Sequence, residues 1–92
     1  MEFEWDEHKN KSNIEKHGVD FIDAKEMFSS PMLVKPDERK NYSETRFQGS
    51  GYIGSRLMVV VYSKKGETIR IISLRKANKR ETKRFLEKQQ KR

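Results

Sequence analysis

The chain of 92 residues contains no cysteine, which excludes a disulfide framework and a thiolate metal site. Long apolar runs are missing too. The longest, LMVVVY at 57–62, falls far short of the roughly 20 residues that span a membrane. The first residues, MEFEWDEHKNK, carry charge from position 2 and therefore do not resemble a signal peptide. We expect a soluble protein of the cytoplasm that contacts no membrane.

Hydrophobic residues are also scarce, at 33%, whereas charged residues make up 38% of the chain. A chain of this length buries roughly 60–65% of its unfolded surface and has room for one modest core. We therefore predict a single domain over residues 1–92, with a thin core and a strongly solvated surface.

The net charge of +7 comes entirely from the end of the sequence. Residues 75–92 hold nine Lys or Arg and two Glu, whereas residues 1–74 hold equal numbers of basic and acidic residues. A basic segment of this kind indicates a nucleic acid or an acidic protein as partner. The alternative is a charged tail that only keeps the protein soluble.

Two helices are predicted in the first third of the chain. Asp6 is placed to cap a helix that runs to about His17, where Gly18 favours the left-handed turn that ends helices. Asp20 is placed to cap a second helix over residues 21–28. The apolar positions of this second segment recur at helical spacing: Phe21, Ala24 and Phe28.

Strand-like segments dominate the middle of the chain. A short strand is expected at residues 3–5, and longer ones follow the helices, at 32–35, 43–53, 56–63 and 68–75. The turn sequence SKKGET joins the last two as an antiparallel hairpin. This order predicts an α+β protein with two N-terminal helices packed on an antiparallel sheet of about four strands.

A third helix is predicted over 79–90, in a basic C-terminal segment that spans 79–92. Asn78, with Glu81 three residues further on, forms the pattern of a capping box at its start. The helix has few apolar residues with which to pack, so its stability in isolation is marginal. We therefore expect it to order fully against a partner.

Strand alternation distributes the side chains over the two faces of the predicted sheet. In the strand at 56–63, we expect Leu57, Val59 and Val61 to face the helices. Arg70 and Arg75 lie five positions apart on the next strand, so alternation predicts that they point to opposite faces. Arg75 ends its strand, where a rigid backbone can aim the guanidinium into a cleft.

The sequence offers no convincing site for a metal or a nucleotide. His8 and His17 lie nine residues apart, which fits no common spacing of metal ligands. PDERK at 36–40 is only weakly typical of a nuclease, since Pro-Asp is more commonly a turn. GSGYIG at 49–54 has the wrong spacing for a phosphate loop. We expect no metal and no cofactor.

Basic residues therefore remain as the candidates for chemistry. Metal-free RNA cleavage needs a base for the 2′-OH, an acid for the 5′-oxygen, and cations that stabilise the charge on phosphate. Arginine suits the last role and histidine suits the proton transfers. His17 is a candidate for proton transfer, although a histidine at a helix end also interacts favourably with the helix dipole. Arg39 and Arg46 either pair with Glu44 at the surface or contact phosphate.

Four stretches of the sequence together carry a family pattern. The most specific are W-D-x-x-K-x-x-x-N-x-x-K-H-G at 5–18 and R-I-I-S-x-R-x-A-x-x-x-E at 70–81. Between them lie PDERKNYSETRF at 36–47 and RLMVVVYS at 56–63. In order and spacing these stretches resemble the BrnT family of type II toxins, from about residue 2 to residue 87. Ser43 and Leu74 depart from the pattern, which is expected to have glycine and alanine there.

The resemblance implies a small RelE-like domain that acts as a ribonuclease, slows translation and growth, and is neutralised by a BrnA-like antitoxin. It also implies a hetero-oligomer, expected to be a heterotetramer formed through antitoxin dimerisation, which reaches operator DNA only through the antitoxin. The alternative is a non-catalytic basic module that binds nucleic acid or an acidic protein partner.

Within this interpretation, a metal-independent endoribonuclease is expected to use three catalytic residues. Arg75 and Arg56 would stabilise the cleaved phosphate, and His17 would transfer a proton. Further basic residues would bind the RNA: Lys16, Arg70, Lys76, Lys79 and Arg80.

Overall fold

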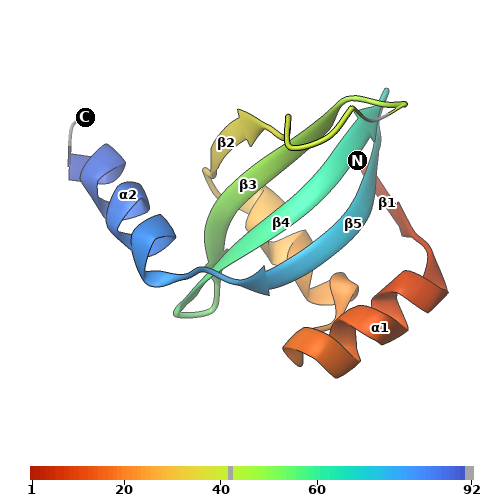
Figure 1. The fold of residues 1–92 in the computed structure, drawn as a ribbon, viewed down its shortest axis with the longest axis horizontal. Coiled ribbons are helices and arrows are strands. Elements are labelled where there is room, and N and C mark those ends of the chain that lie inside the picture. The colour runs from red at the N-terminus through yellow and green to blue at the C-terminus, as the bar shows by residue number, and fades with distance from the viewer. Residues whose placement is uncertain (42, 91–92) are drawn as a thin grey trace.

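Five strands form one sheet in the computed structural model, which describes residues 1–41 and 43–90 (Figure 1). In chain order the elements are β1 (Glu2–Trp5), α1 (Glu7–His17), the 3-10 helix η1 (Phe21–Ser29), β2 (Leu33–Pro36), β3 (Arg46–Ile53), β4 (Arg56–Lys65), β5 (Thr68–Lys76) and α2 (Lys79–Gln90). Across the sheet the strands lie in the order β1-β5-β4-β3-β2. Tyr42 of the family pattern and residues 91–92 of the predicted basic segment lie outside the described residues.

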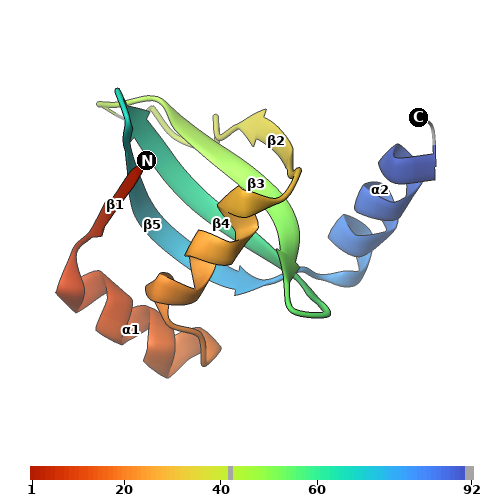
Figure 2. The same ribbon diagram turned by 180° about the vertical axis from the view of Figure 1, so that it is seen from behind.

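The expectation of two N-terminal α-helices on an antiparallel sheet of about four strands is wrong. β1 pairs in parallel with β5, so the sheet has five strands and is mixed. The paired residues, such as Trp5 and Ile71, are far apart in the chain and no tight turn joins them, so hairpin signals do not reveal this pairing. The second N-terminal helix is a 3-10 helix, and it lies across one face of the sheet (Figure 2).

α1 begins and ends where the sequence predicts. The Asp6 carboxylate accepts a hydrogen bond from the backbone N–H of Lys9 at 3.1 Å, and this bond holds the pKa of Asp6 below its usual value. Gly18 takes a left-handed conformation, with φ of 72°, and its N–H donates to the Ile14 carbonyl at 2.8 Å. Both caps are local in sequence, which is why they were predictable.

The core lies between η1 and the sheet. Phe21, Ala24 and Met27 of η1 are fully buried, at the three-residue spacing of a 3-10 helix. They pack against Met58, Val60 and Tyr62 of β4, so the prediction that Leu57, Val59 and Val61 face the helices is wrong. Because both sets on β4 are apolar and buried, alternation alone could not tell which set faces the helices.

A β-bulge in β5 changes the face to which its last residues point. Val61 of β4 pairs with Ser73 and the next residue, Tyr62, pairs with Ile71, so Ile72 is an extra residue in β5. Arg70 pairs with Ser63 and Arg75 with Val59, and these two β4 residues share one face. Arg70 and Arg75 therefore lie on the same face of the sheet, and the prediction of opposite faces is wrong.

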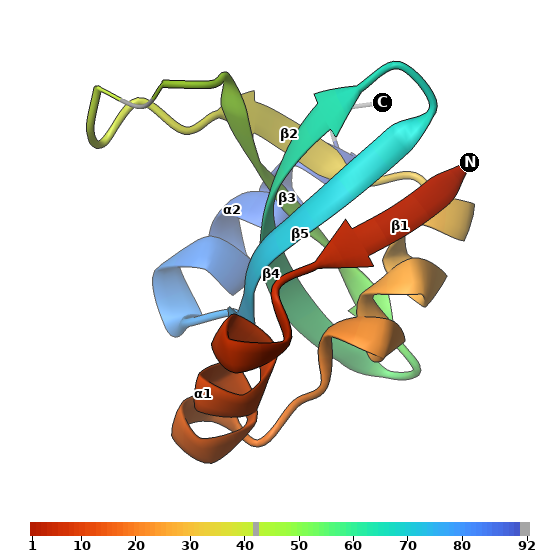
Figure 3. The same ribbon diagram turned by 90° about the vertical axis from the view of Figure 1, so that its right-hand side faces the viewer.

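The side chain of Asn13 attaches α1 to β5 just beyond the bulge. Its Nδ2 donates to the Leu74 carbonyl at 2.7 Å, and its Oδ1 accepts from the Leu74 N–H at 3.2 Å. Asn10 plays a matching part at the start of η1, where its Oδ1 accepts from the Phe21 N–H at 2.9 Å. In Figure 3, α1 lies beyond the end of β1, next to β5. The two asparagines are thus structural residues.

α2 attaches to the sheet through few contacts. The predicted capping box is confirmed, since the Glu81 N–H donates to Asn78 Oδ1 at 2.8 Å and the Asn78 N–H donates to Glu81 Oε1 at 2.9 Å. Phe85 is the buried residue of α2, and its ring packs edge-on against Tyr52 at 5.5 Å between centroids. None of the helices in the described part of the chain is long and apolar enough to cross a membrane.

Candidate nucleic-acid interface

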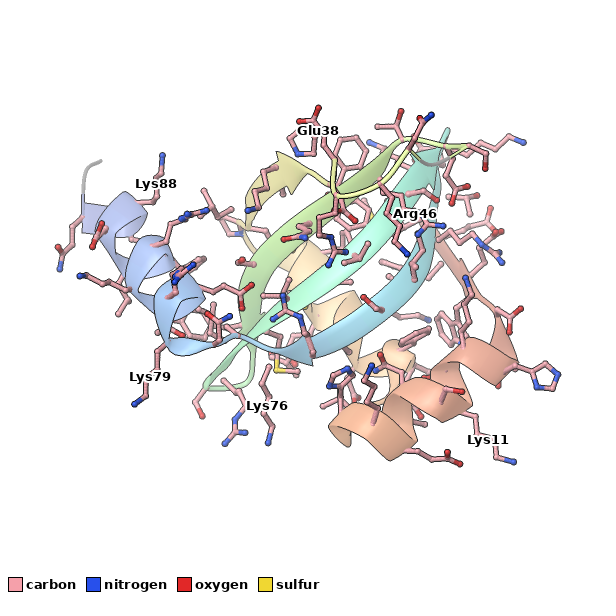
Figure 4. All side chains as sticks on the ribbon, viewed as in Figure 1. Lys11, Glu38, Arg46, Lys76, Lys79 and Lys88 are labelled. Atoms are coloured by element: carbon pink, nitrogen blue, oxygen red, sulfur yellow. The ribbon has the colours of Figure 1, made fainter. Side chains whose placement is uncertain are left out.

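Three arginines lie on the face of the sheet opposite η1 and a fourth lies in a nearby loop, and we call the surface that they form the arginine face. Arg46, Ser63 and Arg70 are paired in one row across β3, β4 and β5, and Arg75 lies on the same face. Arg39 comes from the loop after β2 and is close enough to Arg75 for their two positive charges to repel each other. Figure 4 shows Arg46 over the sheet, on the side away from η1. The arrangement concentrates positive charge on a rigid surface.

Each of these arginines has a carboxylate partner. The shortest nitrogen–oxygen distances are 2.7 Å for Arg39–Asp37, 3.4 Å for Arg46–Glu44, 2.8 Å for Arg70–Glu4 and 2.7 Å for Arg75–Glu81. Exposed pairs of this type add little to stability. Their consequence is orientation, because a paired guanidinium is held in one direction before any ligand arrives.

Arg75 is held by two hydrogen bonds to one carboxylate. Its Nη1 and Nη2 donate to the two Glu81 oxygens at 2.7 and 2.8 Å, and this pairing raises the pKa of Arg75. The same contacts lower the pKa of Glu81 to about 2. Within the described residues, no protein group accepts from the Nε of Arg75. The edge formed by Nε and Nη2 therefore keeps an Nε–H donor for a ligand, on a side chain that is 32% exposed.

Arg39 is fixed by a buried carboxylate. Its Nε and Nη2 donate to the two oxygens of Asp37 at 2.7 and 2.9 Å. The Asp37 side chain is fully buried whereas that of Arg39 is 59% exposed. Asp37, which follows Pro36, therefore holds the Arg39 guanidinium so that its charge faces solvent.

The predicted surface pairing with Glu44 is confirmed for Arg46.

His17 and Lys16 lie in a separate hollow. They line it together with His8, on the side where α1 borders Ile72 and Ser73 of β5. Ser73 is two residues from Arg75, so this hollow adjoins the arginine face without including Arg75. The structure therefore places the neighbouring residues Lys16 and His17 next to the bulge at Ile72.

The other predicted residues lie around α2 and the start of β4. Arg56 and Lys76 line one hollow with Thr82. Arg56 lies two residues before Met58 on β4, so both side chains point to the η1 side of the sheet. Arg56 is therefore on the face opposite Arg75. Lys79 and Arg80 are exposed in the first turn of α2, and Figure 4 shows Lys76 and Lys79 along one edge of the molecule. The predicted catalytic residues Arg75, Arg56 and His17 thus come from three different surfaces.

Sequence reasoning missed the second role of Glu81. The capping pattern identified it as a helix-start residue, but its pairing with Arg75 six residues earlier has no local signal. Among the described residues, no group of three potential metal ligands is present, and the expectation of a metal-free site stays a prediction. The geometry can bind and neutralise anions along a rigid face.

Comparison with known families defines the class of this protein. Residues 5–81 match a family model described as the ribonuclease toxin BrnT of type II toxin–antitoxin systems, a class in which the toxin has an antitoxin as its partner. Because the match covers most of the chain, the protein belongs to the BrnT family, which confirms the resemblance seen in the sequence. A comparison with curated proteins finds no significant match.

Proposed function

We propose that this ribonuclease toxin is a metal-independent endoribonuclease that inhibits translation and growth and is neutralised by a BrnA-like antitoxin. The family supports the activity, and the arginine face supports the substrate. The observation that carries the proposal is the edge of the Arg75 guanidinium whose Nε–H has no acceptor among the described residues. Glu81 holds this guanidinium at the end of β5, and Arg39 from the loop after β2 lies near it. A phosphate of RNA matches this edge in charge and geometry.

The proposed cleavage uses the RNA itself as nucleophile. The 2′-oxygen loses its proton and attacks the adjacent phosphorus, the bond from phosphorus to the 5′-oxygen breaks, and that oxygen takes up a proton. The products are a 2′,3′-cyclic phosphate and a 5′-hydroxyl. Arg75 stabilises the extra negative charge that develops on the phosphate oxygens in the transition state.

His17 is proposed as the proton-transfer group. It lies in the hollow beside Ser73, where a nucleotide next to the one held by Arg75 would pass the β5 bulge. Lys16 in the same hollow would bind that nucleotide's phosphate. Arg70 extends the arginine face along β5, and it would bind RNA further from the cleavage point.

Four more basic residues belong to the proposed RNA-binding surface around α2. Lys76, Lys79 and Arg80 would bind flanking phosphates, and Arg56 shares a hollow with Lys76. Because Arg56 lies on the face opposite Arg75, its proposed part is to bind phosphate beyond the strand end, near α2.

Cleavage of RNA by the purified protein in excess EDTA tests the proposal. We expect cleavage to persist with the chelator and to end in 2′,3′-cyclic phosphates, with Arg75→Ala reduced by at least about 100-fold. Lys11→Ala is the matched control, because Lys11 is an exposed cation on α1 outside the arginine face. Loss of cleavage in EDTA contradicts the metal-free mechanism, and wild-type cleavage by Arg75→Ala contradicts the assignment of Arg75.

The assembly with the antitoxin is proposed to be a heterotetramer built on an antitoxin dimer, with operator DNA bound through the antitoxin. The mass of the co-expressed complex in light scattering tests the stoichiometry. A DNA-binding assay with the toxin alone and with the complex tests the route to DNA. Specific operator binding by the toxin alone would contradict the second statement.

A further inference from the structure

A trough of about 400 Å³ runs between α2 and the edge of the sheet formed by β2 and β3. Its floor and walls are apolar where Met32, Leu33, Tyr52 and Phe85 line it, and Lys88 stands on its rim. In Figure 1, α2 projects beyond β2 and β3, at the end of the molecule away from α1. The trough is partly open to solvent, so an added segment can enter it without unfolding the domain.

One stripe of α2 faces the trough and its continuation. Its members, Glu81, Arg84, Phe85, Lys88 and Gln89, follow the spacing of a single helix face. Of these, only Phe85 is buried. A helix normally buries several residues along the stripe that faces a sheet, because packing supplies most of its stability. The face of α2 is therefore incompletely packed in the isolated chain.

The trough leads to the arginine face. Leu33 lines both the trough and a second hollow, which is bounded by Lys35, Arg84 and Glu81. Glu81 is the carboxylate that holds Arg75. A segment lying in the trough would thus reach the end of the surface where RNA is proposed to bind.

The charges along this path select an acidic occupant. Lys88, Lys35 and Arg84 supply three positive charges, and the one carboxylate, Glu81, is already engaged by Arg75. Apolar side chains of the occupant would contact Leu33 and Tyr52, and its carboxylates would face the cations. An RNA backbone has the charge but lacks apolar side chains that fit the trough.

We infer that this trough is the docking surface for an acidic, apolar-bearing segment of the antitoxin, which covers the Arg75 end of the arginine face when it is bound. The inference rests on the proposed neutralisation by an antitoxin and is independent of how RNA is cleaved. Neutralisation is then steric and electrostatic, because carboxylates of the antitoxin occupy the place of phosphates.

The test is the affinity of the full-length toxin for the antitoxin encoded with it, measured by calorimetry for two charge reversals. Lys88→Glu lies on the trough rim and Lys11→Glu lies on α1 at the opposite end of the molecule (Figure 4). We expect the Kd to rise at least about tenfold for Lys88→Glu and to stay unchanged for Lys11→Glu. Equal affinity of the two variants would overturn the inference.

A second variant separates the apolar contact from the charge. Leu33→Asp places a carboxylate in the trough at a partly exposed position, and circular dichroism checks that the variant is folded. We expect it to weaken antitoxin binding at least about tenfold and to leave the toxin active against growth when the antitoxin is co-expressed. Unweakened binding by a folded Leu33→Asp chain would overturn the docking site.

RNA cleavage by the free variants distinguishes this inference from the proposed function. Lys88→Glu lies outside the proposed RNA contacts, so its cleavage rate should equal that of the wild type. If the wild type does not cleave RNA at all, the cleavage mechanism fails while the binding result still stands. If Lys88→Glu loses RNA affinity and keeps antitoxin affinity, or if Leu33→Asp dissolves a toxin homodimer, the trough has another occupant and the inference fails.

Discussion

The guanidinium of Arg75 and the carboxylate of Glu81 form two hydrogen bonds, at 2.7 and 2.8 Å, that join the end of β5 to the first turn of α2. Glu81 also accepts from the Asn78 N–H, so one side chain both starts the helix and orients the arginine. Any change at this pair should therefore affect the stability of α2 and the binding of RNA together.

Arg75→Lys separates charge from geometry at this position. Lysine keeps the positive charge but cannot hold Glu81 with two nitrogens while presenting a planar edge to phosphate. We expect RNA cleavage to fall by at least about tenfold while the net charge of the protein is unchanged. A gel assay with a single end-labelled RNA measures the rate. Full activity of Arg75→Lys would show that a simple point charge is sufficient there.

Acid should weaken the fold through Glu81. Its pKa falls from 4.5 to about 2 in the folded chain, so the pair stabilises the native state above about pH 4.5, and this stabilisation is lost as the pH falls toward about 2. Urea unfolding of the wild type and of Glu81→Gln at about pH 5 and about pH 3 measures the difference. The difference in unfolding free energy should be larger at the higher pH. An equal difference at both values would contradict the pairing.

Asn13→Ala should destabilise the protein without touching the arginine face. The side chain satisfies both the N–H and the carbonyl of Leu74, and the substitution leaves these backbone groups unpaired. We expect a loss of about 2 kcal/mol in the free energy of unfolding, measured by denaturant titration. Ser12→Ala, at a neighbouring exposed position of the same helix, is the control. A neutral Asn13→Ala would show that water replaces the amide without cost.

Arg70→Ala should weaken RNA binding because the bulge puts this residue on the same face as Arg75. The affinity should fall for all RNA sequences alike, and the slope of log K against log salt should drop by about one. Lys65→Ala, at the β4–β5 turn, is a matched control of equal charge. A salt slope that Arg70→Ala leaves unchanged would remove Arg70 from the RNA surface.

His17→Ala and His8→Ala compare two histidines that line the same hollow. If His17 transfers a proton, its removal should lower kcat by about 100-fold or more and flatten the pH dependence of cleavage. His8→Ala, which removes the histidine that lines the same hollow from the start of α1, should leave both unchanged because proton transfer is assigned to His17. Similar kinetics for both variants would assign His17 to its alternative role at the helix end.

Features with a local cause were predictable from the sequence. The caps at Asp6, Gly18 and Asn78 follow from hydrogen bonds between residues at most four positions apart, and the β4–β5 hairpin follows from its turn. The concentration of charge at the C-terminus requires no structure at all. The family pattern was equally readable, because identities at set spacing survive without knowledge of the fold.

The tertiary structure alone decided which surfaces these residues share. One extra residue in β5, Ile72, reverses the alternation and places Arg70 with Arg75, which counting along the chain cannot detect. The parallel pairing of β1 with β5 and the contact of Glu81 with Arg75 likewise depend on how distant or differently structured segments pack. The sequence by itself therefore determined the local elements and the charge, whereas packing and register decided the sheet and its arginine face, because side-chain direction depends on pairing partners.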